Sequence, residues 1–206
     1  MLAVVGGRIP APDGLVEGGG DVETAIDWLR AKGIAKAAKK AGRAATDGAV
    51  GSYIHAGGKI GVLVEVNCET DFAARSDQFQ ALVRDLAMHI AAAGPLYVRK
   101  DEIPGDELER EKAIQLQRVI EEGKPEHIAE KIVDGRLGKW YQDVCLLEQK
   151  FVKDDDKTIE QVLQDAVSVI GENIQIRRFS RYVLGEGLDK KVDDFASEVA
   201  AQAGLA

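Results

Sequence analysis

An apolar, β-branched run occupies residues 59–66 and places valine at every second position, at Val62, Val64 and Val66. A strand with one buried face requires this period of two. Residues 50–55 precede the run, and the connection at 56–58, Ala-Gly-Gly, is of the kind that closes a β-hairpin. Residues 174–182 alternate apolar and polar positions much later in the chain. We therefore predict a small three-stranded antiparallel sheet, made of the hairpin and a returning strand.

Much of the remaining chain repeats apolar residues at helical spacing, with glycine or proline where the repeats end. The helix predicted to begin after Ser76, for example, carries Phe79, Val83 and Ile90 on one face. The predicted helices span residues 21–30, 36–45, 77–93, 105–122, 125–137, 139–147, 158–170 and 188–203, with a polar turn at 153–157. Together with the sheet they predict an α+β fold.

Glycine and proline also divide the chain into four segments. Residues 1–20 are rich in both and show no period, so we expect them to be flexible. We expect a helical segment with a basic linker helix at 21–48, a core domain at 49–185 and a C-terminal helix at 186–206.

The overall charge argues against a surface adapted throughout to nucleic acid or anionic membrane, because the formal net charge is -8 and the pI is near 5.0. The basic residues nevertheless gather at 36–43, Lys-Ala-Ala-Lys-Lys-Ala-Gly-Arg. This segment has three interpretations: a solvated helix face, an RNA-binding arm, or a docking helix for an acidic patch on a protein. The absence of interleaved aromatic residues weakens the RNA interpretation.

Cysteine usage indicates a reducing compartment, since Cys68 and Cys145 are too few for a disulfide framework. The chain shows neither an apolar run long enough to span a bilayer nor the pattern of a secretory signal. We expect a cytoplasmic protein without membrane contact. The matrix of a plastid or mitochondrion is the alternative, if a transit peptide has been removed.

No arrangement of residues indicates catalysis. His55, His89 and His127 lie far apart and outside zinc or nucleophile motifs, and Gly58-Lys59 lacks the rest of a phosphate-binding loop. We expect His89 to be structural, His127 to be solvated, and no metal or cofactor to be bound. An enzyme with an unrecognised site remains one hypothesis.

The strand at 59–66 ends at a corner that carries an aromatic residue. Asn67 and Thr70 offer side-chain oxygens that end strands and open helices, and Phe72 follows at once. A ring at such a corner either tucks under the next helix or projects outward as an anchor for a partner. The pattern alone leaves both alternatives open.

The words Asn-Cys-Glu-Thr-Asp-Phe at 67–72, with the segments at 51–63 and 170–174, resemble the translation elongation factor Ts family. The resemblance runs from roughly residue 20 to 194. It implies an α+β core and a guanine nucleotide exchange factor, without covalent chemistry, for the GTPase elongation factor Tu in its GDP-bound and nucleotide-free states. By this resemblance Thr70, Asp71 and Phe72 reach the partner's nucleotide site and help to dislodge its magnesium ion. Ala73 stands where family members usually have valine.

The resemblance also implies further contacts with elongation factor Tu. They would involve His55, Lys40, Val152, Ile170 and Gly171, each within a segment similar to one that the family uses on its partner. Alternatives from the residues alone are a loop histidine without a role at His55 and a core position at Ile170.

Two features set this chain within the family. Its single core resembles that of the short forms of the family, in which the sheets of two chains pack into a homodimer. Because residue Ser180 in the third strand is not a cysteine, no disulfide can join two chains at that position. The segment at 21–48 resembles only the last helix of the family's N-terminal domain, so we expect a remnant domain. A ribosome- or RNA-associated protein that uses residues 36–43 is the alternative function.

Overall fold

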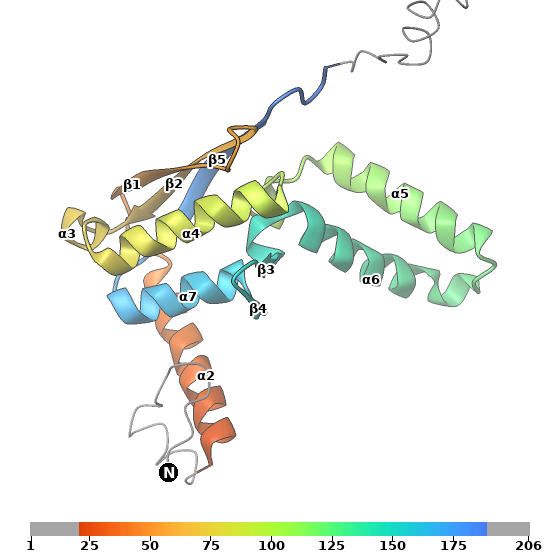
Figure 1. Ribbon diagram of the computed structural model, residues 1–206. Coiled ribbons are helices and arrows are strands. Elements are labelled where there is room, and N and C mark those ends of the chain that lie inside the picture. The colour runs from red at the N-terminus through yellow and green to blue at the C-terminus, as the bar shows by residue number, and fades with distance from the viewer. Residues whose placement is uncertain (1–20, 189–206) are drawn as a thin grey trace, which may run out of the picture.

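The computed structural model describes residues 21–188 (Figure 1). The helices are α2 (Val22–Lys40), α3 (Asp71–Ala74), α4 (Asp77–Ala93), α5 (Gly105–Glu121), α6 (Glu126–Val144) and α7 (Ile159–Ile170). The strands are β1 (Asp47–Ile54), β2 (Ile60–Cys68), β3 (Lys150–Phe151), β4 (Asp154–Thr158) and β5 (Gln175–Val183). The expected flexible segment 1–20, and all but the first residue of the predicted helix 188–203, lie outside the described residues.

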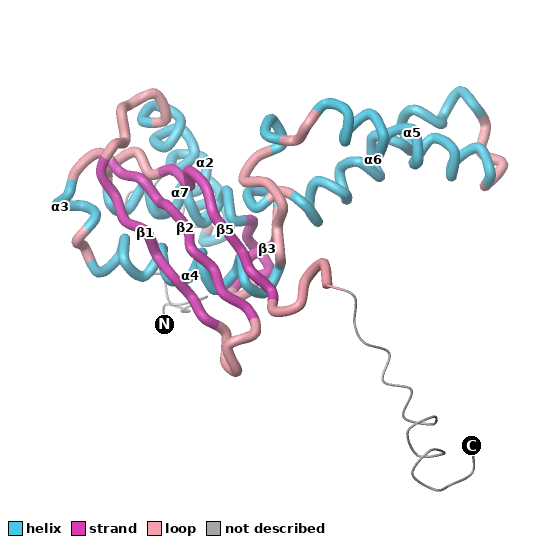
Figure 2. The backbone as a smooth tube through the Cα atoms, turned by 90° about the horizontal axis from the view of Figure 1, so that it is seen from above, coloured by secondary structure: helices cyan, strands magenta, loops and turns pink. Residues whose placement is uncertain are grey.

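β1, β2 and β5 form one antiparallel sheet in the order β1-β2-β5, which confirms the predicted hairpin and returning strand. β2 is central, so Val64 pairs with Gly51 on one side and with Phe179 on the other. Figure 2 looks onto this sheet, with helices behind it. A second sheet of β3 and β4 occupies the stretch for which the sequence predicts only a polar turn.

The main core lies between the inner face of the sheet and α4, with α7 packed beside α4. Alternate residues of β2 point inward, and Ser76 starts α4 with a side-chain cap on the backbone N–H of Phe79. Gly94, with φ of +61°, ends α4 in the left-handed conformation. The largest fully buried side chains of this core are Phe79, Leu86, Ile90, Leu146, Ile159 and Ile176.

Two of the predicted helix breaks are wrong. The chain continues through Gly33 as the single helix α2, where two helices at 21–30 and 36–45 are predicted, and through Gly138 as the single helix α6. Glycine inside a helix costs only about 1 kcal/mol relative to alanine, which packing can offset. At Gly33 the packing is visible, because Ser168 of α7 donates its hydroxyl to the Gly33 carbonyl at 3.2 Å.

α5 and α6 form an antiparallel arm that projects sideways from the sheet (Figures 1 and 2). The arm has its own small core of Val119, Ala129, Val133 and Leu137. None of the described helices combines the length and the apolar character that crossing a membrane requires. The arm is thus an appendage that packs largely on itself.

Gly51 lets α4 approach β1 closely. A methyl group at this position would lie 2.2 Å from Cγ1 of Val83, a β-branched side chain with little rotamer freedom. We expect Gly51→Ala to lower the free energy of unfolding by about 1–3 kcal/mol, the usual cost of overpacking a core. Urea unfolding followed by circular dichroism measures this.

Gly135→Ala is the matched control, because Gly135 lies inside α6 with nothing within 4 Å of the added methyl group. It should leave stability unchanged or raise it by up to about 1 kcal/mol. Equal effects of the two substitutions would contradict the close approach at Gly51.

Candidate functional site

The corner after β2 is built by a helix cap. Thr70 has extended backbone angles, and its hydroxyl oxygen accepts the backbone N–H of Ala73 at 3.2 Å, which starts the four-residue helix α3. Ala73 and Ala74 are buried and anchor α3 on the main core. Phe72, between cap and anchor, is 88% exposed. The alternative in which this ring tucks under the next helix is therefore wrong, and the ring projects into solvent.

The buried Cys68 supports the same corner from the end of β2. Its Sγ lies 3.2 Å from the Thr70 carbonyl oxygen, so the S–H donates to that oxygen. Burial raises the pKa of the Cys68 thiol and keeps the proton that this contact needs.

Asp71 forms a bidentate ion pair with Arg75 one turn further along. The Nε of Arg75 lies 3.1 Å from one carboxylate oxygen, and an Nη atom binds the other. Both side chains are largely exposed, so the pair contributes little to stability. Asp71 is thus available to a partner at the cost of a weak internal contact.

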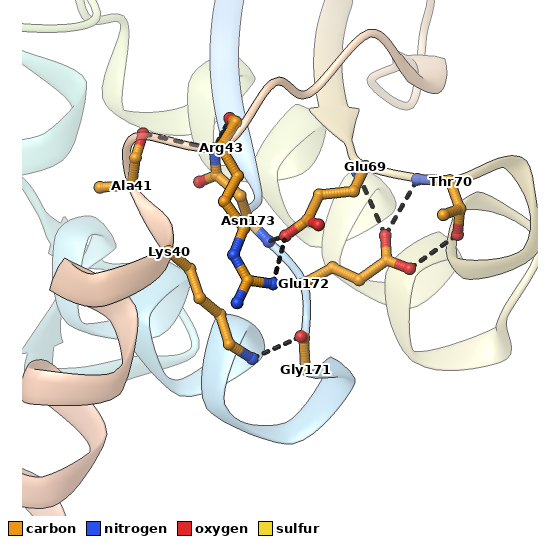
Figure 3. A network of polar contacts seen from close by, with 8 residues as sticks. All are labelled: Lys40, Ala41, Arg43, Glu69, Thr70, Gly171, Glu172 and Asn173. Carbon is orange, nitrogen blue, oxygen red and sulfur yellow. Dashed lines mark hydrogen bonds and ion pairs between the residues drawn. The ribbon is translucent and has the colours of Figure 1, made fainter.

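A second loop, which follows α7, holds the corner through a carboxylate (Figure 3). The Glu172 side chain accepts the backbone N–H groups of Glu69 and Thr70 at 3.1 and 3.0 Å, and the Thr70 hydroxyl at 2.7 Å. The hydroxyl that caps α3 therefore donates its own proton to Glu172. These residues lie more than a hundred positions apart in the chain.

Glu69 returns the same interaction to the second loop. Its carboxylate accepts the backbone N–H of Asn173 at 2.7 Å and lies 3.4 Å from the Arg43 guanidinium (Figure 3). The Asn173 side chain in turn donates to the Arg43 carbonyl at 2.7 Å. The two loops and the segment after α2 are therefore fastened to one another.

The structure brings Lys40, Gly171 and Thr70 together, three of the residues that sequence reasoning proposed. Lys40, the last residue of α2, donates its ammonium to the Gly171 carbonyl, and Gly171 caps α7 with φ of +88° (Figure 3). Ile170 is half-buried and packs against the main core. The ammonium of Lys40 serves a contact within the chain, whereas Lys36 and Lys39 are exposed.

His55 and Val152 lie away from the corner. His55 is exposed in the turn before β2, and since β2 has 9 residues, that turn is about 30 Å from the corner. Its Nδ1 lies 3.2 Å from the Tyr53 hydroxyl. Val152 is exposed in the β3–β4 turn.

The structural role expected for His89 is confirmed. The ring is buried, Nδ1 accepts the backbone N–H of Val152 at 3.3 Å, and Nε2 donates to the Gln149 side chain at 3.0 Å. Burial lowers the pKa of His89, which favours this neutral form. His127 is exposed on α6, also as expected.

The resemblance placed the segment 170–174 next to the Phe72 corner, but sequence reasoning gave no role to Glu69, Glu172, Asn173 and Arg43, the residues that fasten the two loops together. The only local signal is a polar pair directly after the glycine that ends α7. Within residues 21–188, no group of three His, Cys, Asp or Glu side chains is arranged to hold a metal ion.

The outer face of the sheet carries a separate cluster of exposed apolar residues, Val50, Ile54, Leu63 and Tyr182. Beside it, Glu65 accepts hydrogen bonds from Arg177 at 2.8 Å and Arg178 at 2.7 Å. These bonds lower the pKa of Glu65 from its ordinary value of 4.5 to about 2.

An exposed aromatic ring on a corner that hydrogen bonds hold from two sides is typical of a protein that docks onto another protein. Comparison with known proteins gives that class a family. The family model described as Elongation factor TS matches residues 34–186. The chain belongs to the elongation factor Ts family of translation elongation factors, which act in protein biosynthesis.

Curated relatives agree with the family model over nearly the whole chain. Elongation factor Ts of Geobacter sulfurreducens is 63% identical over 199 residues, which cover 97% of this chain and 92% of the relative. Elongation factor Ts of Anaeromyxobacter sp. is 58% identical over 199 residues, with 97% and 91% covered. That of Desulforamulus reducens is 56% identical over 196 residues, with 95% and 90% covered.

The hydrogen bonds of Glu65 with Arg177 and Arg178 predict that the stability of the fold depends on pH. Because the folded-state pKa lies below the ordinary value, the two hydrogen bonds stabilise the fold fully above pH 4.5, and this contribution is lost as the pH falls toward about 2. We expect Glu65→Gln to melt at a lower temperature than the parent protein near neutral pH, and the two melting temperatures to converge in acid. Calorimetry across this range provides the measurement; a constant difference at all pH values would contradict the assignment.

Proposed function

We propose that this protein is a guanine nucleotide exchange factor for elongation factor Tu and acts in the cytoplasm during polypeptide elongation. The observation that carries the proposal is the exposed ring of Phe72 on a corner fastened from two sides. Membership of the elongation factor Ts family, and the bacterial origin of the relatives, support it.

The proposed mechanism is displacement without covalent chemistry. A GTPase holds GDP partly through magnesium, which neutralises phosphate oxygens, and partly through backbone donors of its phosphate loop. Phe72 would enter an apolar gap beside the magnesium site, while Thr70 and Asp71 would help to shift the surroundings of the metal. Either the GDP-bound or the nucleotide-free partner would be bound, the latter more tightly.

Linkage makes this mechanism reversible. If the factor weakens nucleotide binding, then nucleotide weakens binding of the factor by the same ratio. Entry of GTP would therefore release the factor, and the ratio of GTP to GDP would set the direction of exchange.

Secondary contacts with elongation factor Tu would come from His55, Val152, Ile170 and Gly171. Ala73, which the resemblance also places at the contact, is buried, so it would support the ring from beneath and would not touch the partner. His55 and Val152 are exposed on turns well separated from the corner, so they could touch a large partner at several points. Lys40 would contribute indirectly, because its ammonium is bound to Gly171.

Phe72→Ala tests the role of the ring. Truncating an aromatic anchor at an interface typically costs at least about 2 kcal/mol, which corresponds to a roughly thirtyfold slower release. Stopped-flow release of a fluorescent GDP from elongation factor Tu measures the rate. Stability should not change, because the ring is exposed in the free protein.

Ile120→Ala is the control for this experiment, because Ile120 is also an exposed apolar residue, 65% accessible, but lies on the α5–α6 arm. It should release GDP at the rate of the parent protein. An unchanged rate with Phe72→Ala would refute the assigned role of the corner.

We also propose that two chains form a homodimer through the outer face of the sheet. Leu63 is central there, since it pairs with Ser52 on β1 and Ser180 on β5, and it is 50% exposed. Neighbouring apolar side chains continue the surface at Val50, Ile54 and Tyr182. Exposed apolar residues that cluster together, with charged residues at their rim, are typical of association surfaces.

Leu63→Arg places a charge at the centre of that surface and should convert the dimer to a monomer. Light scattering coupled to size-exclusion chromatography measures the mass in solution. Ile120→Arg, on the arm, should leave the mass unchanged. A parent protein that is monomeric at all accessible concentrations would exclude this dimer.

A further inference from the structure

We propose that Glu172 is a positioning residue for nucleotide exchange: its carboxylate fixes the cap of α3 and so holds Phe72 in the orientation that meets the partner. This inference rests on the proposed function, since it concerns the same corner. Glu172 is not expected to touch nucleotide or magnesium; it acts through Thr70.

The contacts of Glu172 define the direction of the Thr70 hydroxyl. That hydroxyl has one proton, and it goes to the Glu172 carboxylate at 2.7 Å. Its lone pairs are then left for the backbone N–H of Ala73, which lies 3.2 Å away. The carboxylate therefore selects the hydroxyl orientation that caps α3.

The other oxygen of Glu172 restrains the backbone directly in front of the ring. It accepts the N–H groups of both Glu69 and Thr70 at about 3 Å. Hydrogen bonds that a carboxylate accepts from two successive backbone N–H groups are charge-assisted and stronger than neutral ones. The chain that enters the corner is thus fixed on the side where β2 has already ended.

α3 needs this restraint because it is only four residues long. Such a short helix has no stability of its own in water. Ala73 and Ala74 hold its far side on the core, whereas the side before Phe72 has no buried side chain between Cys68 and the ring. Orientation of the ring therefore depends on hydrogen bonds, namely the three that Glu172 accepts and the contact of the Cys68 thiol with the Thr70 carbonyl.

Glu69 makes the arrangement reciprocal. Each carboxylate accepts backbone N–H groups of the other loop, since Glu69 accepts from Asn173 while Glu172 accepts from Glu69 and Thr70. Arg43 lies 3.4 Å from Glu69 and supplies a positive charge beside that carboxylate. A ring held in this way loses less conformational freedom when it binds, which raises the rate of a step that requires one orientation.

The test is Glu172→Gln, which keeps the size of the side chain but removes its charge and replaces the oxygen that accepts the Thr70 hydroxyl proton with an amide donor. We expect the maximal rate of GDP release from elongation factor Tu to fall about fivefold to tenfold, the size of a lost helix cap. The concentration of factor at half-maximal rate should change little, because the remaining contact surfaces are intact. Glu160→Gln, an exposed carboxylate in the first turn of α7, is the control and should exchange at the parent rate.

A double-mutant cycle with Phe72→Ala separates positioning from general stability. If Glu172 acts through the ring, Glu172→Gln should slow release in the parent but change it by less than about twofold in the Phe72→Ala background. An equal slowing in both backgrounds, or none in the parent, would overturn the proposal. If the variant does not fold, Thr70→Val, which removes only the capping hydroxyl, replaces it in the same cycle.

Amide hydrogen exchange of the free protein gives a readout that needs no partner. Glu172→Gln should speed exchange at Thr70 and Ala73 while leaving α4 unaffected. Unchanged exchange there overturns the positioning role by itself. If Phe72→Ala fails to slow GDP release, the proposed function of the corner fails, and the positioning inference fails with it; if Phe72→Ala slows release and Glu172→Gln does not, only the inference fails.

Discussion

The pairing of β5 with β2 is the constraint on which the rest of the structure depends. It places the strand at Gln175–Val183 along the central strand of the sheet, although most of the helices lie between the two in the chain. Because both ends of this pairing are fixed, the loop at 171–173 must arrive beside the loop at 68–70. The corner, the exchange of carboxylates between the loops and the exposure of Phe72 follow from that single arrangement.

The sequence predicted those parts of the fold that depend on interactions between residues close together in the chain. The alternation at Val62, Val64 and Val66 placed the central strand, and the helical spacing of apolar residues over 77–93 with the break at Gly94 bounded α4 as the structure has it. Gly33 and Gly138 misled, because a glycine is tolerated inside a helix once packing outweighs its modest cost. The β3–β4 pair escaped notice because its strands are short and rich in aspartate.

The candidate site also combines features that neighbouring residues predict with contacts that form only across the fold. The order of Thr70, Asp71 and Phe72 along the chain predicted a corner. Whether the Phe72 ring points inward or outward depends on how Ala73 and Ala74 pack on the core, which the sequence does not show. The resemblance placed the segment 170–174 next to the corner, but the contact between Glu172 and Thr70 could not be derived from the sequence, since it exists only after β5 has returned. Residues that hold a functional group in place are harder to find than the group itself, because they act across the fold.

The separate core of the α5–α6 arm has a consequence for how this protein can vary during evolution. Its interior of Val119, Ala129, Val133 and Leu137 is separate from the main core, and its tip turns at Gly123, with φ of +68°. Figures 1 and 2 place it on the opposite side of the molecule from α3. Insertions, deletions and surface substitutions in this hairpin can therefore accumulate between related proteins without disturbing the corner.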